Sequence, residues 1–193
     1  TIGEIINSYK EGWSIFVSSL AVNLYTATNI VVLGMLTNNV IVGYYSAADK
    51  LITCVRRGIY AVSDAIYPFI SKMMKDDISK GLQFIKKQIF LYLVVGLIGC
   101  TSLFFFSDTI VKLLFGADYN LTVDVLRILS FVPLAVAIST VFGEETMLPL
   151  NMNSAYSRTL VLAAFFSLLS IFPLCYLWGA KGVAMTMLLT EFL

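Results

Sequence analysis

Residues 43–70 read GYYSAADKLITCVRRGIYAVSDAIYPFI. The stretch is long enough to cross a bilayer, for which roughly 20 apolar residues suffice, yet it carries charges at Asp49, Lys50, Arg56, Arg57 and Asp64. At about 100° per residue, most of its polar side chains gather within one sector of roughly 100°: Tyr45, Asp49, Thr53, Arg56, Tyr60, Ser63, Asp64 and Tyr67. The opposite side carries no charge. The pattern therefore predicts one helix with a polar stripe and an apolar stripe.

The midpoint of this helix falls near Arg56 and Arg57. One arginine facing lipid there costs about 2.5–3.5 kcal/mol, so two cost roughly 5–7 kcal/mol. The polar stripe should therefore face protein or water. The alternative is an amphipathic helix that lies flat on the membrane surface. The apolar side is rich in Ala and Gly, which suits contact between helices and favours the spanning arrangement.

The rest of the chain is even less polar. Of its 193 residues, 59% are apolar and 13% charged, and histidine is absent. An ordinary soluble domain is about 45–50% apolar and about 25% charged. This composition indicates a membrane protein, and it excludes intrinsic disorder, a secreted disulfide scaffold and a surface for binding nucleic acid.

The apolar runs divide the chain into helices. Together with residues 43–70 they predict an all-α integral membrane fold, a six-helix transmembrane bundle over residues 1–193, with helices at about 13–36, 43–70, 88–106, 123–142, 160–178 and 181–193. The last run is truncated, and we expect a fragment of a longer chain. Asp76 or Asp77 should cap the helix that begins near Ile78. Residues 109–115 predict a short interfacial helix closed by Gly116.

Basic residues are distributed unevenly between the two sides of this bundle. With six helices, one side holds both chain ends and seven basic residues: Lys10, Lys72, Lys75, Lys80, Lys86, Lys87 and Arg158. The other side holds Lys112 and Lys181. Because basic loops stay in the cytoplasm, both ends should be cytoplasmic.

Catalytic chemistry has little support in the residues. The absence of histidine removes the commonest base and metal ligand near neutral pH. Adjacent residues on a helix point about 100° apart, so Glu144 and Glu145 should not meet at one point, and we expect both to be solvated. We predict no metal site and no cofactor.

Transport chemistry has better support, because ionisable residues inside a membrane are functional candidates. The polar stripe predicts that Asp49, Arg56, Arg57, Tyr60 and Asp64 line a central cavity. The two arginines could hold an anion such as a phosphate or a sugar acid. One aspartate could pair with Arg56, or bind a proton or a cation. The alternative is an internal ladder of salt bridges that only satisfies the helix.

The first helix offers further polar residues for the same cavity. Ser18, Tyr25 and Asn29 share one of its faces. Hydrogen bonding between helices is the favoured alternative for these three. Farther along the chain, Asp124 and Arg127 are three residues apart and should pair with each other.

An ordered set of motifs resembles a known family. The pieces are VGYYSAADKL at 42–51, AIYP at 65–68, LLFGADY at 113–119, VLRIL at 125–129 and GAKGVA at 179–184. Their order and spacing resemble the second half of the polysaccharide and O-antigen flippases of the multidrug/oligosaccharidyl-lipid/polysaccharide transporter superfamily. The resemblance covers essentially the whole chain.

The resemblance implies a parent of about twelve helices in two lobes that works by alternating access in the bacterial inner (cytoplasmic) membrane. The implied substrate is an undecaprenyl-pyrophosphate-linked oligosaccharide, and the implied driving force is a proton or sodium gradient. Implied partners are membrane lipid, the N-terminal lobe of the same protein and the polysaccharide polymerase machinery. Two alternatives stay open: a cation-coupled multidrug or metabolite antiporter of the same superfamily, and a membrane-embedded enzyme of polysaccharide assembly.

Overall fold

The computed structural model describes residues 2–193, and it describes their side chains except at residues 2–11, 14, 15 and 18. The described residues are almost all helical and include no strand. In chain order the elements are α1 (Ile2–Leu36), α2 (Asn39–Asp76), α3 (Ile78–Phe115), α4 (Asn120–Leu129), α5 (Val132–Phe142), a π-helical turn η1 (Gly143–Met147), α6 (Asn153–Trp178) and α7 (Ala180–Glu191). The all-α fold class is confirmed.

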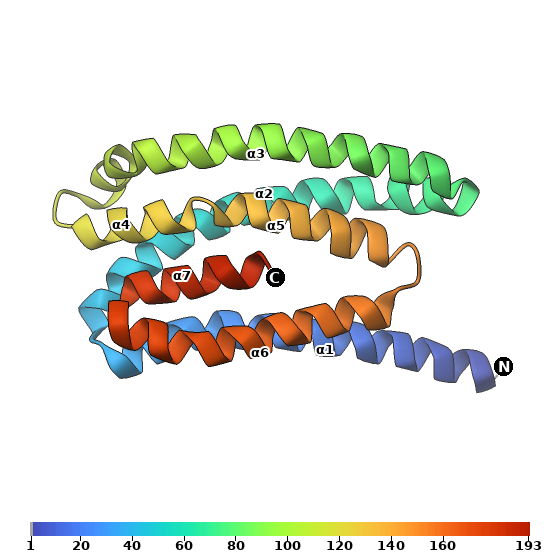
Figure 1. Cartoon of the computed structure of the whole chain (residues 1–193), viewed down its shortest axis with the longest axis horizontal. Coiled ribbons are helices and arrows are strands. Elements are labelled where there is room, and N and C mark those ends of the chain that lie inside the picture. The colour runs from blue at the N-terminus through green and yellow to red at the C-terminus, as the bar shows by residue number, and fades with distance from the viewer. Residues whose placement is uncertain (1) are drawn as a thin grey trace.

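The helices run side by side as one elongated bundle (Figure 1). α1 packs along α6, α2 packs along α3, and α4, α5 and α7 lie between these two pairs. One end of the bundle holds the start of α1, the α2–α3 junction and the η1–α6 connection, and the other end holds the α1–α2, α3–α4 and α6–α7 junctions. The stretch from Lys72 to Lys87 thus lies at the same end as Arg158, away from Lys112 and Lys181, as the charge pattern predicted.

Two of the expected boundaries differ from the structure. The fourth expected helix is divided into α4 and α5, which follow each other end to end and continue into η1. The separate interfacial helix expected at 109–115 was wrong, because α3 continues without a break to Phe115. No Gly or Pro interrupts this part of α3, and Lys112 Nζ lies 2.8 Å from Asp108 Oδ2 one turn earlier, which supports a continuous helix. Gly116 does close it, with a φ of 101°.

The junction between α2 and α3 is a single residue, Asp77. Its carboxylate accepts hydrogen bonds from the backbone N–H of Ser79, at 2.9 Å, and of Lys80, at 3.3 Å. The expected N-cap is therefore confirmed at Asp77. The hydrogen bond from the Lys80 amide, followed by that from Ser79, holds the pKa of this carboxyl below its ordinary value.

Four helical segments among the described residues are long and apolar enough to cross a membrane: Ser19–Leu36, Ile78–Phe115, Asn120–Met147 and Asn153–Trp178. α2 falls outside this set because of its charges. It is nevertheless as long as α3, at 38 residues, and runs beside it within the bundle (Figure 1). A helix lying flat on the membrane would instead run across the spanning helices, so this packing favours the spanning arrangement.

The main core lies where α1 to α7 meet, with α3 contributing Val111. Leu33, Tyr45, Ile52, Leu126 and Val183 belong to it, and each is at most 1% exposed. The core thus includes part of the polar stripe of α2.

The turn between α6 and α7 depends on two glycines of the GAKGVA motif. Gly179 has a φ of 56°, which a residue with a side chain rarely adopts. A Cβ on Gly182 would overlap the backbone carbonyl of Leu174 in α6. These glycines therefore let α7 fold back closely against α6.

Candidate functional site

The polar stripe of α2 faces the inside of the bundle. Tyr45, Arg56 and Ser63 are buried, whereas Val55 and Val62 on the apolar stripe are exposed. This orientation confirms the expectation that the stripe faces protein or a cavity. It also explains why α2 has poor hydropathy for a spanning helix: its polar side never needs to face lipid.

A cavity of about 680 Å³ opens along this stripe. Its wall on α2 comprises Arg56, Tyr60, Ser63, Asp64 and Tyr67, and the remaining wall is Ser19, Val22, Asn23, Glu144, Leu148, Tyr156 and Leu160. The volume lies within the range of about 300–1,000 Å³ typical of small-molecule sites. Three of the residues predicted to line a cavity, Arg56, Tyr60 and Asp64, therefore lie together here.

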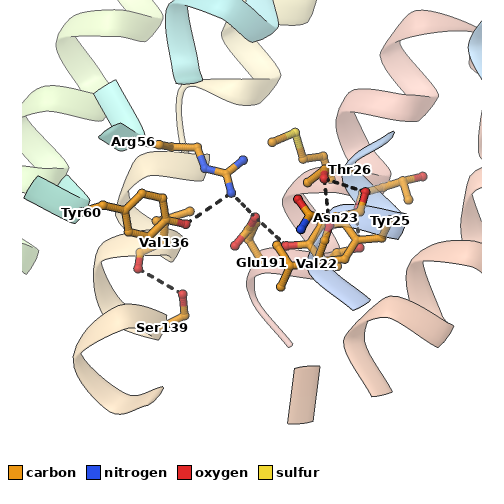
Figure 2. A network of polar contacts seen from close by, with 12 residues as sticks. Val22, Asn23, Tyr25, Thr26, Arg56, Tyr60, Val136, Ser139 and Glu191 are labelled. Carbon is orange, nitrogen blue, oxygen red and sulfur yellow. Dashed lines mark hydrogen bonds and ion pairs between the residues drawn. The ribbon is translucent and has the colours of Figure 1, made fainter. Parts of the chain in front are cut away.

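Arg56 joins three helices at the inner wall of the cavity. Its Nη2 atom lies 3.1 Å from Glu191 Oε1 on α7 and 3.5 Å from the Tyr60 hydroxyl. On the other side, the Tyr25 hydroxyl of α1 donates to the same Glu191 oxygen, at 3.2 Å. Figure 2 shows Arg56 extended toward Glu191, with Tyr60 and Tyr25 on either side. Both charged side chains are about nine-tenths buried, at 11% and 8% exposure.

The expected pairing of Arg56 with Asp49 or Asp64 is not found among the ion pairs of the described residues. Asp49 lies seven residues before Arg56, about 10.5 Å along the helix axis. The Arg56 side chain instead extends across the bundle to Glu191, which is 135 positions away in sequence. Spacing along one helix could not predict this partner.

Asp49 and Asn29 lie at a second, smaller cavity of about 70 Å³, which Arg56 also borders. Asn29 is 2% exposed, and its buried Oδ1 atom has no hydrogen-bond partner within the described part of the chain. The polar stripe thus divides between two cavities, with Arg56 at the boundary.

Arg57 is exposed and is not among the residues that line either cavity. Its place differs from that of Arg56 because adjacent residues on a helix point about 100° apart. Interhelical hydrogen bonding is confirmed for Tyr25 through its bond to Glu191. The side chain of Ser18 lies outside the described residues.

The expectation that Glu144 and Glu145 are solvated was wrong. Glu145 is 0% exposed, and its two oxygens accept hydrogen bonds from Ser63 Oγ, at 2.6 Å, and Gln88 Nε2, at 2.5 Å. Glu144 is half-buried at the wall of the large cavity. Both residues lie on the π-helical turn η1, whose wider winding directs one carboxylate inward and the other toward the cavity.

The predicted pair Asp124–Arg127 was also wrong. Asp124 Oδ2 lies 2.7 Å from Lys181 Nζ, which ties α4 to α7, and Arg127 Nε donates to Ser107 Oγ at 3.1 Å. Each partner comes from another helix, so tertiary packing overrides the local i,i+3 spacing.

Glu191 and Glu145 are the site residues that sequence reasoning missed. A signal existed for Glu191, which is the one charge in the apolar run 185–193. An ionisable residue in such a run is a functional candidate by default. For Glu145 the sequence held no comparable signal, because its partners come from α2 and α3.

The arrangement suits recognition of an anion better than covalent chemistry. Arg56 carries a permanent charge and several donors at the cavity wall, which suits phosphate or carboxylate oxygens. Among the described residues, no cluster of three or more His, Cys, Asp or Glu side chains could hold a metal ion. The apolar helices around an internal polar cavity define a multi-pass membrane protein.

Comparison with known proteins shows which multi-pass membrane proteins this chain is similar to. Residues 2–74 match the family model described as polysaccharide biosynthesis protein. The chain is 31% identical over 191 residues to a putative O-antigen transporter of Escherichia coli (strain K12), covering 99% of this chain and 46% of the relative. It is 30% identical over 189 residues to a putative O-antigen transporter of Shigella dysenteriae, covering 98% of this chain and 47% of the relative. The chain is thus related to the polysaccharide and O-antigen transporters, and the resemblance seen in its motifs is confirmed.

A more distant relative is a capsular polysaccharide biosynthesis protein of Staphylococcus aureus, 27% identical over 180 residues, with coverage of 91% of this chain and 44% of the relative. The chain spans about half the length of the curated relatives it matches. No solved structure matches it significantly.

Proposed function

We propose that this chain is the C-terminal six-helix lobe of a two-lobe flippase that moves an undecaprenyl-pyrophosphate-linked oligosaccharide across the bacterial inner membrane. The observation that carries the proposal is the similarity to O-antigen transporters over 99% of the chain. The substrate class is that of O-antigen or capsule repeat units. The N-terminal lobe, membrane lipid and the polymerase machinery are the proposed partners.

The cavity supplies the chemistry for such a substrate. A lipid-linked sugar carries negative charge at its pyrophosphate, and guanidinium groups bind phosphate oxygens through short, charge-assisted hydrogen bonds. Arg56 lies at the wall of a cavity of about 680 Å³ that also presents hydroxyls for sugar contacts, at Tyr60, Ser63 and Tyr156. We assign the recognition of the anionic group to Arg56.

The guanidinium of Arg56 is paired with the Glu191 carboxylate. An incoming phosphate must compete with this carboxylate, and exchange of one anion for the other avoids leaving Arg56 buried and unpaired, which is costly. Because Glu191 belongs to α7, the exchange would free α7 from α2. Alternating access needs a differential interaction of this kind, since a ligand shifts a conformational equilibrium only by its unequal affinity for the two states. The gradient that drives the cycle is proposed to be one of protons or sodium ions.

The test is substitution of Arg56 in the protein that carries this chain. Arg56→Gln alone would leave Glu191 unpaired, so the informative variant is Arg56→Gln combined with Glu191→Gln, which removes both charges and keeps hydrogen-bonding groups. We expect this double variant to reach the membrane in normal amount and to lose surface polysaccharide, measured by gel analysis of extracted polysaccharide.

Arg57→Gln is the matched control, because it removes an exposed arginine next in sequence. It should keep surface polysaccharide near the wild-type level. Normal export by the folded double variant would defeat the role given to Arg56. Drug sensitivity on deletion, with surface polysaccharide intact, would instead indicate the antiporter alternative.

A further inference from the structure

Glu145 is a carboxylate buried inside the bundle, toward the end that holds the η1–α6 connection, and it has no cationic partner among the described residues. Glu145 is 0% exposed, and its neighbours Ser63 and Gln88 are 2% and 6% exposed. The three residues come from η1, α2 and α3. None of the ion pairs among the described residues includes Glu145. An isolated buried carboxylate is unstable relative to the neutral acid, so this position favours binding of a proton.

The hydrogen bonds of Glu145 fit both of its protonation states. When it is ionised, Ser63 Oγ and Gln88 Nε2 each donate to one of its oxygens. In that state Gln88 Oε1 is buried and has no hydrogen-bond partner among the side chains that the structure describes. A protonated carboxyl has one O–H donor and keeps acceptor capacity. Protonation thus adds a donor next to the Gln88 amide, whose Oε1 atom lacks one.

Ser63 connects this carboxyl to the large cavity. Its side chain donates to Glu145 and also belongs to the wall of that cavity, next to Asp64. A hydroxyl both donates and accepts, so it can pass a proton from the Glu145 carboxyl toward the cavity and return one. Glu145 is thus separated from the cavity by a single hydroxyl.

We propose that Glu145 is the proton-binding site of this lobe, loaded and unloaded through Ser63 and the large cavity, and that it couples the proton gradient to transport. The proposal rests on the proposed function, because it names the coupling ion that the function leaves open. On unloading, the Glu145 O–H bond breaks and Ser63 Oγ takes this proton while its own hydroxyl proton passes to water in the cavity, so Glu145 changes from neutral to a charge of −1; loading is the reverse.

The donor set distinguishes a proton from a sodium ion. A hard cation needs several oxygen lone pairs directed at it. Here two donors, the Ser63 hydroxyl and the Gln88 amide, point at the carboxylate oxygens instead. The geometry therefore favours proton exchange over cation binding.

The titratable groups nearest the turn are acids and phenols, and Arg56, the cation on the same cavity wall, is paired with Glu191. Asp64 lies on α2, Tyr92 on α3, Tyr156 on α6 and Glu144 on η1 itself. Glu144 and Asp64 line the cavity side, and the Tyr156 hydroxyl donates to Glu144 at 3.5 Å. These groups offer no positive charge to hold Glu145 ionised, and the nearby negative charges favour its protonated form.

The experiment is infrared difference spectroscopy on the full-length protein in lipid nanodiscs as the pH is stepped upward. We expect the wild type to lose a band of a protonated carboxyl, and we expect this change to be absent in Glu145→Gln. Glu144→Gln is the matched control on the same turn and should keep the band. An unchanged band in Glu145→Gln would overturn the proposal.

Should that variant not fold, the rate at which the band is lost after a pH jump is measured in Ser63→Ala. The proposal expects a slower loss in this variant than in the wild type, and a wild-type rate would contradict it.

Measuring the amount of surface polysaccharide distinguishes the proposal about Glu145 from the proposed flippase function. Glu145→Gln should abolish export while the protein stays folded in the membrane. If export persists although the band is gone, Glu145 binds a proton without coupling, and the inference fails while the flippase assignment stands. If the neutral Arg56 and Glu191 double variant exports normally, the assignment of Arg56 fails, and the infrared result still tests Glu145.

Discussion

At the scale of single residues, Arg56 and Glu191 form a buried ion pair whose two members come from α2 and α7. Removing both charges from such a pair is often nearly neutral for stability, whereas removing one leaves an uncompensated buried charge. The pair therefore ties the proposed binding residue to the position of α7 and makes single substitutions hard to interpret.

A double-mutant cycle on this pair measures the coupling. Glu191→Gln alone should lower the free energy of unfolding by about 3–5 kcal/mol, because Arg56 then stays charged and unpaired. Adding Arg56→Gln should recover most of this loss. The measurement is denaturant unfolding of the purified full-length protein in detergent. Additive losses in the double variant would show that the two side chains do not interact.

At the scale of elements, the turn between α6 and α7 is governed by close backbone approach. Gly182 faces the carbonyl of Leu174, with no room for a Cβ, and Ala184 beyond it is fully buried. The small residues of the GAKGVA motif therefore let α7 pack closely against α6.

Gly182→Ala tests this packing. The added methyl group must push α7 away from α6, and we expect a loss of at least about 1–3 kcal/mol in the free energy of unfolding, together with lower surface polysaccharide. Gly99→Ala in α3 is the matched control, because a Cβ there meets nothing within 4 Å. Equal stability of the two variants in thermal unfolding would contradict the close contact between α6 and α7.

At the scale of the whole molecule, the bundle keeps its polar stripe inside and turns apolar side chains outward. The core is apolar as in a soluble protein, but the exterior is apolar too, which suits contact with lipid. The large cavity is bordered by α1, α2, α6 and η1, so any movement of these helices relative to one another changes its shape.

Cysteine labelling tests this orientation in membranes. The native Cys54 is exposed on α2, so the three native cysteines are first replaced by serine. Single cysteines at Asp64 and Tyr67, which line the cavity, should then react with a water-soluble maleimide. Cysteines at Val62 and Ala65, which are exposed on the apolar stripe, should not react. Equal labelling at all four positions would contradict the placement of α2.

Much of the fold could be predicted from local sequence. The sector occupied by Tyr45, Arg56 and Ser63 predicted which side of α2 faces inward, because helical geometry fixes the direction of each side chain once the helix exists. A cap at Asp76 or Asp77 and a helix end at Gly116 were predicted for an equally local reason, since each acts on backbone within a few residues of itself, and the structure selects Asp77.

The partners of the charged residues could not be predicted in this way. Asp124 pairs with Lys181 rather than with Arg127, and Glu145 is buried rather than solvated. In each case the residue that pairs with the charged side chain is far away in sequence. Sequence spacing describes only contacts within one helix, whereas these contacts depend on which helices pack together.

The sequence by itself determined that this is an apolar helical chain with one polar stripe, and it carried the motifs of polysaccharide transporters. Only the tertiary structure decided that Arg56 and not Arg57 reaches the cavity, that Glu191 is its partner, and that Glu145 lies between Ser63 and Gln88. The physical reason is that composition and helical periodicity are local properties of the chain. A buried charge finds its partner across helices, and that partner is fixed only when the bundle has packed.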